Sequence, residues 1–215
     1  YHRLPDLGIC RRQHLVGGNS TAAISRENFL SITPIIMNTE SVHYLNIFLG
    51  AGAIGLQNVF AIALLILLFG SKKNILLDFI YSHFLPIGFL ISLFSTLFSL
   101  VYSEIIHFAP CYLCWLQRIF MFPLIFLFGV AFWDEDKRVV RYAIPLVSVG
   151  FVISVYQNFF YYFGENSSLP CDASGVSCYK QLVYEFGGYI SIPMLALTGF
   201  FSLLVLLVIV HFYKR

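Results

Sequence analysis

The run PCYLCWLQRIFMFPLIFLFGVAFW, residues 110–133, joins a C-x-x-C pair to an apolar stretch long enough to cross a membrane. A helix needs about 20 mostly apolar residues to span the hydrocarbon core of a bilayer. Cys111 and Cys114 come directly before that stretch, and Arg118 follows four residues after Cys114. A guanidinium inside a membrane helix is costly and marks a candidate functional residue. The run therefore predicts two reactive thiols at a water–lipid boundary, with a cation just beneath them.

The remainder of the chain is also apolar. Hydrophobic residues make up 59% of it and charged residues only 11%, against roughly 25% charged residues in soluble domains. We expect an all-α membrane protein, since too little polar sequence remains to cover a soluble helical core. The five predicted membrane-spanning stretches are Leu45–Phe69, Phe84–Ile106, Trp115–Trp133, Tyr142–Phe163 and Gly187–Phe212. The net charge of +2 and the lack of a basic run give no indication of nucleic-acid binding.

The basic residues between these stretches predict the orientation of the chain. Short cytoplasmic loops of membrane proteins carry an excess of Lys and Arg. With five spans, three groups of basic residues fall on one side, which we take as cytoplasmic. The C-x-x-C turn, the loop over residues 165–186 and the N-terminal segment then lie on the extracytoplasmic side. The basic residues concerned are Lys72, Lys73, Lys137, Arg138, Arg141, Lys214 and Arg215.

The segment before the first span forms a separate part of the chain. Residues 1–43 are more polar than the rest of the chain, and we interpret them as a tail. Cys10 lies in this tail, and we assign it no role. One interpretation has native translation starting at Met37, and the other treats the tail as exported. Residues 44–74 are expected to hold a first helix and a cytoplasmic loop, and residues 75–215 a four-helix redox domain.

A second cysteine pair accompanies the first. Cys171 and Cys178 bracket the loop sequence Cys-Asp-Ala-Ser-Gly-Val-Ser-Cys, on the same predicted side as Cys111 and Cys114. Strained or exposed disulfides are the labile, catalytic ones. The thiolate is the attacking species, and a nearby cation or helix N-terminus favours it. We therefore predict disulfide exchange between the two pairs, with Arg118 beside Cys114.

Other interpretations of these residues remain open. Both pairs could be static structural disulfides in a non-catalytic scaffold. Zinc is disfavoured, because six residues separate the second pair and zinc leaves Arg118 unexplained; no metal is expected. Arg118 could merely extend to the interface. We expect His83 and His107 to be interfacial polar residues, and Gln57 and Asn58 to bond to neighbouring helices.

The run Pro110–Pro123 resembles the DsbB/BdbC family of disulfide bond formation proteins. Its distinctive feature is a C-x-x-C followed two residues later by Gln-Arg, at the entry to a membrane helix. The later cysteine pair and the run Ser191–Leu197 are also similar to the family. The resemblance covers about Phe84 to Phe212. In the related vitamin K epoxide reductase family, the C-x-x-C follows the loop pair instead of preceding it.

This resemblance implies a DsbB-like four-helix transmembrane bundle, here with one additional N-terminal transmembrane helix, in a bacterial inner or plasma membrane. A DsbA-like thioredoxin-fold protein would attack Cys171. Cys178 would exchange with Cys111, and Cys114 would face a quinone, either ubiquinone or menaquinone, with Arg118 beside it. Electron flow in the opposite direction, toward reduction of exported disulfides, stays open as an alternative.

The sequence departs from the family pattern in three places. The span Leu45–Phe69 has no counterpart in the four-helix core. The loop between Cys171 and Cys178 is short, as in BdbC-type members. Finally, this chain has Tyr156-Gln-Asn158 where many relatives carry a histidine, so the sequence offers no histidine for proton handling there.

Overall fold

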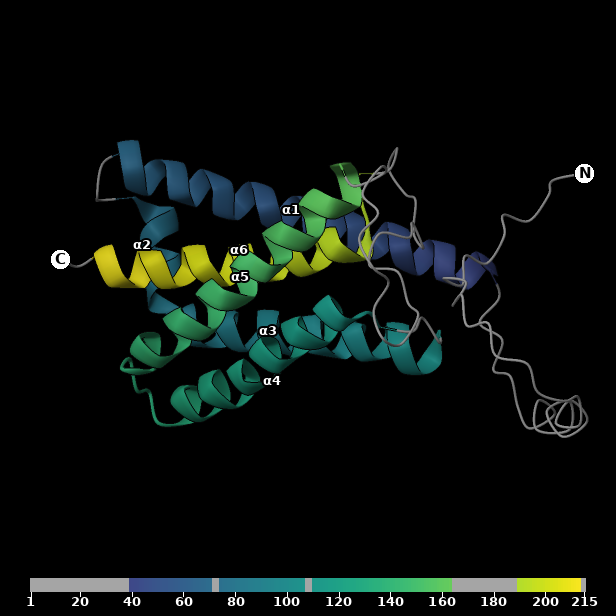
Figure 1. Ribbon diagram of the computed structural model, residues 1–215. Helices are drawn as coiled ribbons and strands as arrows, with labels where there is room; N and C mark the ends of the chain where they lie inside the picture. The colour runs from purple at the N-terminus through teal and green to yellow at the C-terminus, as the bar shows by residue number, and fades with distance from the viewer. Residues whose placement is uncertain (1–38, 71–73, 107–109, 164–188, 214–215) are drawn as a thin grey trace, which may run out of the picture.

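The computed structural model describes residues 39–70, 74–106, 110–163 and 189–213, which form a bundle of helices (Figure 1). Our expectations for Cys10, Met37, His107, Cys171, Cys178 and the basic residues 72, 73, 214 and 215 lie outside these ranges. The elements are α1 (Thr39–Phe69), α2 (Ile75–Ser82), α3 (Phe84–Leu100), the π-helix η1 (Val101–Ile105), α4 (Tyr112–Trp133), α5 (Val139–Phe163) and α6 (Ile192–Phe212).

Five of the described helices are long and apolar enough to cross a membrane, which confirms the predicted fold class. They are α1, α3 with its extension η1, α4, α5 and α6. Their order along the chain also agrees with the five predicted stretches. The protein is therefore a multi-pass, all-α membrane protein. Helices suit a bilayer, because each helix satisfies its backbone hydrogen bonds within itself.

Four of the five predicted helix starts were wrong; α1 begins at Thr39 rather than Leu45, and α5 at Val139 rather than Tyr142. The third span begins at Tyr112 rather than Trp115, with Cys111 in extended conformation as its N-cap, so Cys114 lies inside the first turn. The fifth begins at Ile192 rather than Gly187, because Ser191 caps it by accepting a hydrogen bond from the Met194 amide. Pro193 in the first turn fits such a start.

The short helix α2 was not predicted. Asn74 caps its N-terminus, and the Asn74 side chain accepts a hydrogen bond from the Leu76 amide at 3.2 Å. The helix has only 8 residues, so it joins α1 to α3 at one end of the bundle without crossing a bilayer. Leu77 and Ile80 on α2 are buried in the core.

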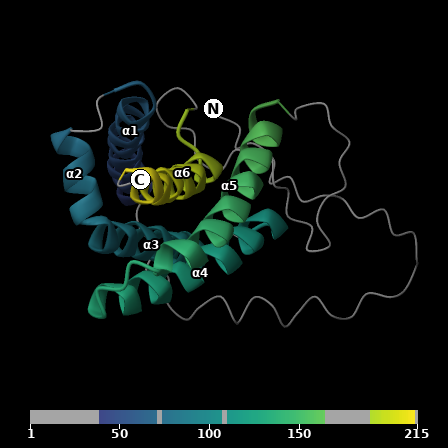
Figure 2. The ribbon, with the colours of Figure 1, turned by 90° about the vertical axis from the view of Figure 1, so that its left-hand side faces the viewer.

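Helix α6 occupies the centre of the bundle (Figure 2). It packs against α1, α2, α3 and α5, while α4 packs against α3 and α5. Of the most apolar 18-residue stretch of α6, 56% is buried inside the bundle, whereas only 17% of the corresponding stretch of α1 is buried. The helices run so that α1, α4 and α6 begin, and α3 and α5 end, at the end of the bundle that holds the C-x-x-C (Figure 1).

The opposite end of the bundle is closely packed. At Gly88 of α3, an added Cβ would lie 2.7 Å from Phe128 on α4; nearer the middle of the bundle, at Gly150 of α5, it would overlap the ring of Phe200 on α6. Small residues let membrane helices approach this closely. Large side chains there are fully buried, among them Leu77, Phe84, Leu124, Phe128, Leu203, Leu206, Leu207 and Ile209. This half holds the helices in register for the site at the other end.

Candidate functional site

The two cysteines of the C-x-x-C meet at the start of α4. Their sulfur atoms lie 3.0 Å apart in hydrogen-bond contact. Cys111 is buried, whereas Cys114 is partly exposed. Because Cys111 is the N-cap and Cys114 the third residue of the helix, both sulfurs lie near its partial positive charge, which favours a thiolate. A small movement would bring the sulfurs to the bond length of a disulfide, about 2.05 Å.

Gln157, which the sequence brought up only as part of Tyr156-Gln-Asn158, contacts both sulfurs. Gln157 of α5 is 2% exposed. Its side-chain NH₂ group lies 3.5 Å from the Cys111 sulfur and 3.4 Å from the Cys114 sulfur. Its carbonyl oxygen accepts a hydrogen bond from Nε2 of Gln117 at 2.7 Å, and this bond turns the NH₂ group toward the thiols. Polar side chains inside membrane helices are the sequence signal that could have pointed to both glutamines.

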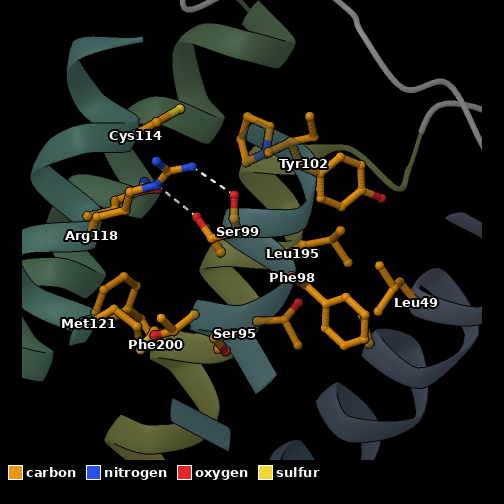
Figure 3. Close-up of a pocket in the computed structure, with 18 of the residues that line it drawn as sticks. Leu49, Ser95, Phe98, Ser99, Tyr102, Cys114, Arg118, Met121, Leu195 and Phe200 are labelled. Carbon is orange, nitrogen blue, oxygen red and sulfur yellow. Dashed lines mark hydrogen bonds between the residues drawn. The ribbon is translucent and has the colours of Figure 1, made fainter. Parts of the chain in front are cut away.

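Arg118 is buried and turned toward α3. It is 8% exposed; its Nε donates to the Ser99 hydroxyl at 2.9 Å and its Nη2 to the Ser99 carbonyl oxygen at 2.7 Å (Figure 3). The guanidinium carbon lies 5.3 Å from the centre of the Trp115 ring. Among the described residues, no carboxylate pairs with it. The cation is therefore held inside the bundle by α3, and its positive charge remains available to an anionic or carbonyl oxygen.

A cavity of about 420 Å³ opens beside Cys114 and Arg118. We call it the thiol-side cavity; its walls come from α1, α3, η1, α4, α5 and α6. Figure 3 shows Cys114 and Arg118 on one side of it and Leu49 on the other. The volume lies in the range of small-molecule sites, about 300–1,000 Å³. Apolar lining residues include Leu49, Phe94, Phe98, Leu195 and Phe200, and polar ones Ser99, Cys114, Gln117, Arg118 and Gln157.

This lining suits a flat apolar molecule that carries carbonyl oxygens, such as a quinone. Leu49, Phe98 and Leu195 would surround an apolar ring and side chain, while Arg118 supplies donors for an oxygen. Cys114 lines the same space, so a sulfur that can lose electrons borders the place where such a molecule would bind. Mostly apolar pockets with a few placed polar groups are typical of cofactor sites.

The other polar residues singled out in the sequence have mixed outcomes. Gln57 bonds to a neighbouring helix as predicted, since its Nε2 donates to the Thr198 hydroxyl of α6 at 2.6 Å. The expectation for Asn58 was wrong: its Nδ2 donates to the Ile54 carbonyl oxygen of its own helix. His83 lies between α2 and α3, with its Nδ1 atom 3.1 Å from the Phe79 carbonyl oxygen.

A pair of adjacent thiols, a buried cation and an apolar cavity inside a multi-pass bundle are features of integral membrane thiol oxidoreductases. The family model for the disulfide bond formation protein DsbB matches residues 81–210, more than half of the chain, and the chain belongs to that family. It is thus a membrane protein of disulfide bond formation. Helix α1 lies outside the matched residues.

Similar curated proteins bear the same description. "Probable disulfide formation protein C 2" of Bacillus cereus is 37% identical over 133 residues, which are 62% of this chain and 94% of the relative. "Disulfide bond formation protein C" of Bacillus subtilis is 39% identical over 127 residues, 57% of this chain and 88% of the relative. No solved structure matches the chain.

Proposed function

We propose that the protein accepts electrons from a DsbA-like thioredoxin-fold thiol oxidase and delivers them to a membrane quinone, ubiquinone or menaquinone. The observation that carries the proposal is the position of Cys114 and Arg118 on the wall of the thiol-side cavity, next to Cys111. The family membership supports the thiol chemistry. Lys137, Arg138 and Arg141 lie in and after the connection from α4 to α5, at the end of the bundle away from the thiols. This distribution supports an extracytoplasmic position for the thiols.

Thiol chemistry on the partner side would use the later pair, Cys171 and Cys178. A thiolate of the reduced partner attacks Cys171 of their disulfide and forms a mixed disulfide, releasing Cys178 as a thiolate. The second partner thiol then displaces Cys171, so the partner leaves oxidised and the pair holds two thiols. Cys178 next attacks Cys111 of a Cys111–Cys114 disulfide, and Cys171 resolves this bond. The later pair is oxidised again, and the C-x-x-C becomes a dithiol.

Electrons would leave through the C-x-x-C. When bound, a quinone would supply the acceptor chemistry, since a quinone becomes a quinol by gaining two electrons and two protons. Cys114, at the cavity wall, is the thiol that gives up its electrons, and Cys111 closes the disulfide with it. Arg118 would hold an oxygen of the acceptor and favour the Cys114 thiolate. Gln157 donates to both sulfurs, which favours the thiolate in the same way.

The chemistry is tested with the full-length protein in lipid nanodiscs. Dithiothreitol serves as the electron donor and decylubiquinone as the acceptor, and quinone absorbance is followed after subtracting protein-free nanodiscs. Cys111→Ser and Cys114→Ser should each reduce the rate to the background. Cys10→Ser is the matched control and should retain the wild-type rate. Quinone reduction that survives both C-x-x-C substitutions would reject the proposal.

The role of Arg118 is tested by two substitutions. Arg118→Ala removes the charge and the two bonds to Ser99, while Arg118→Lys keeps a charge but not the fork of donors. A charge-assisted hydrogen bond contributes about 1.5–3 kcal/mol. We therefore expect the half-saturating decylubiquinone concentration to rise at least tenfold for Arg118→Ala and less for Arg118→Lys. Thermal unfolding checks that both variants fold, and an unchanged quinone affinity would contradict the assigned role.

Electron flow through the cysteines separates this proposal from a scaffold. Thiol trapping in cells should find reduced Cys111 and Cys114 when respiration, and with it quinone reoxidation, is stopped. A scaffold with structural disulfides would stay oxidised under both conditions. Redox titration of both pairs against the quinone couple decides between this direction and a reductive relay, because electrons flow toward the higher potential.

A further inference from the structure

Helix α1 supplies one wall of the thiol-side cavity, although it lies outside the part of the chain that matches the family. Five of its residues line the cavity: Phe48, Leu49, Gly52, Ala53 and Leu56. Their spacing of one, three and four residues places them on one face of a helix over about two turns. The same face therefore meets the space that Cys114 and Arg118 border from α4.

Polar contacts fix this face of α1 at both ends. Above it, the Tyr102 hydroxyl of η1 donates to Asn46 Oδ1 at 2.5 Å, and both side chains are buried. Below it, Gln57 donates to Thr198 of α6 and accepts from the Tyr189 hydroxyl at 2.8 Å. Lipid offers no replacement for such hydrogen bonds. These hydrogen bonds therefore hold the cavity-lining residues of α1 at a fixed position relative to η1 and α6.

The upper contact also links α1 to Arg118. Tyr102 lies in η1, which continues α3 directly after Ser99 and Leu100. Ser99 is the residue that accepts both hydrogen bonds from Arg118. Single-turn π-helices occur frequently at functional sites. The segment of residues 99–102 thus contacts Arg118 through Ser99 and contacts α1 through Tyr102.

Gly52 leaves open space at the middle of the wall. A Cβ added at Gly52 would meet no atom within 4 Å, although Gly52 lines the cavity. A Cβ added at Gly55 would also meet open space, but Gly55 does not line the cavity. The missing side chain at Gly52 therefore adds room inside the cavity, whereas the missing side chain at Gly55 does not.

We infer that α1 is part of the acceptor-binding site, and that Gly52 determines how bulky a quinone the thiol-side cavity accepts. This inference rests on the proposed function. The oxygen-bearing ring meets Cys114 and Arg118, and the apolar portion of the quinone lies against Leu49, Gly52 and Leu56. The additional helix is then a specificity element for the membrane acceptor, and not only a membrane anchor.

The test compares two glycine-to-leucine variants of the full-length protein. Leucine has the higher helix propensity, so neither Gly52→Leu nor Gly55→Leu should weaken α1 itself. Both are made with Trp133→Phe, which leaves Trp115 as the remaining tryptophan of 2 in the chain. Quenching of Trp115 fluorescence by decylubiquinone in nanodiscs measures binding. The half-quenching concentration should rise at least tenfold for Gly52→Leu and stay within twofold of wild type for Gly55→Leu.

A second measurement does not depend on any substitution. A photoreactive azidoquinone is bound to the wild-type protein and its attachment sites are mapped by mass spectrometry. Labels should appear on the α1 peptide with Phe48–Leu56 and on the α4 peptide, and excess decylubiquinone should suppress both. Labelling of α4 alone, or equal quinone affinity for the two leucine variants, would overturn the role of α1.

The two proposals fail in different ways. If the wild-type protein neither quenches with decylubiquinone nor takes up the label, the quinone site is rejected and the role of α1 with it. If binding is present and Arg118→Ala weakens it, while Gly52→Leu leaves it unchanged, the proposed function stands and only the inference on α1 is rejected.

Discussion

The two ends of the bundle are built on different principles. At the end away from the C-x-x-C, apolar side chains from α2, α3, α4, α5 and α6 fill the interior, and glycines allow close helix contacts. At the thiol end, buried polar side chains and the thiol-side cavity take their place. The buried polar residues there are Asn46, Thr96, Gln117, Arg118, Gln157, Asn158, Ser191 and Thr198.

This difference shows how a membrane bundle accommodates a polar candidate site and a cavity within a packed fold. Close packing of apolar side chains specifies the positions of the helices. Buried polar groups are expensive in lipid unless they bond to one another. Gln117 and Gln157 illustrate the solution, since the buried Gln117 side chain donates to the buried Gln157 carbonyl oxygen and so joins α4 to α5. The packed end therefore holds the closely packed core, and the thiol end holds the candidate site.

The largest predicted effect is on stability at the packed end. Phe128 is 0% exposed, whereas Phe126 on the same helix is 73% exposed. Removing a buried phenyl ring costs about 3–5 kcal/mol, so Phe128→Ala should lower the free energy of unfolding by that amount. Phe126→Ala is the matched control and should change it by less than about 1 kcal/mol. Unfolding by dodecyl sulfate in mixed micelles gives both values; equal effects would remove the contrast between the two ends.

The next effect is on chemistry at the thiol end. Gln157→Leu removes the hydrogen bonds to both sulfurs and leaves the Gln117 amide without its acceptor. A lost hydrogen bond to a charged sulfur, about 1.5–3 kcal/mol, should slow the reduction of decylubiquinone at least tenfold. Ser154→Ala, one turn away on α5, removes only a bond to the helix's own backbone and should leave the rate unchanged. If both variants react at the wild-type rate, Gln157 has no part in the thiol chemistry.

The smallest effect compares two helix caps, one at each end. Ser191 caps α6 beside the cavity, and Asn74 caps α2 at the packed end. Replacing either cap with alanine should cost about 1 kcal/mol of stability. Only Ser191→Ala should also weaken decylubiquinone binding, because Ile192 and Pro193 of the first turn line the cavity. A matching loss of binding in Asn74→Ala would show that the two ends are coupled through the fold.

Much of the fold could be predicted from hydrophobic length alone. Five apolar stretches gave five helices in the predicted order, because a membrane helix needs only local sequence to satisfy its backbone. The starts of α1, α4, α5 and α6 were less well predicted, since a helix start depends on a few side chains and not on hydrophobicity. The eight-residue helix α2 was missed for a different reason, because its length is far below that of a membrane span.

The candidate site was predictable where its residues are close in sequence. Cys111, Cys114 and Arg118 lie within two turns of one helix, so their mutual placement follows from helix geometry. Gln157 was not predicted, because it is 40 residues from Gln117 and reaches the thiols only where α5 crosses α4. Cys171 and Cys178 lie outside the described residues, and their part in the exchange stays a prediction.

By itself, the sequence determined that this is a five-span membrane protein with two thiols and a guanidinium at one membrane boundary, because apolar length and residue spacing act locally. Only the tertiary structure decided that Gln157 contacts both sulfurs, that Ser99 holds Arg118, and that α1 lines the thiol-side cavity. These contacts depend on how whole helices cross, and crossing is set by side-chain packing between segments far apart along the chain.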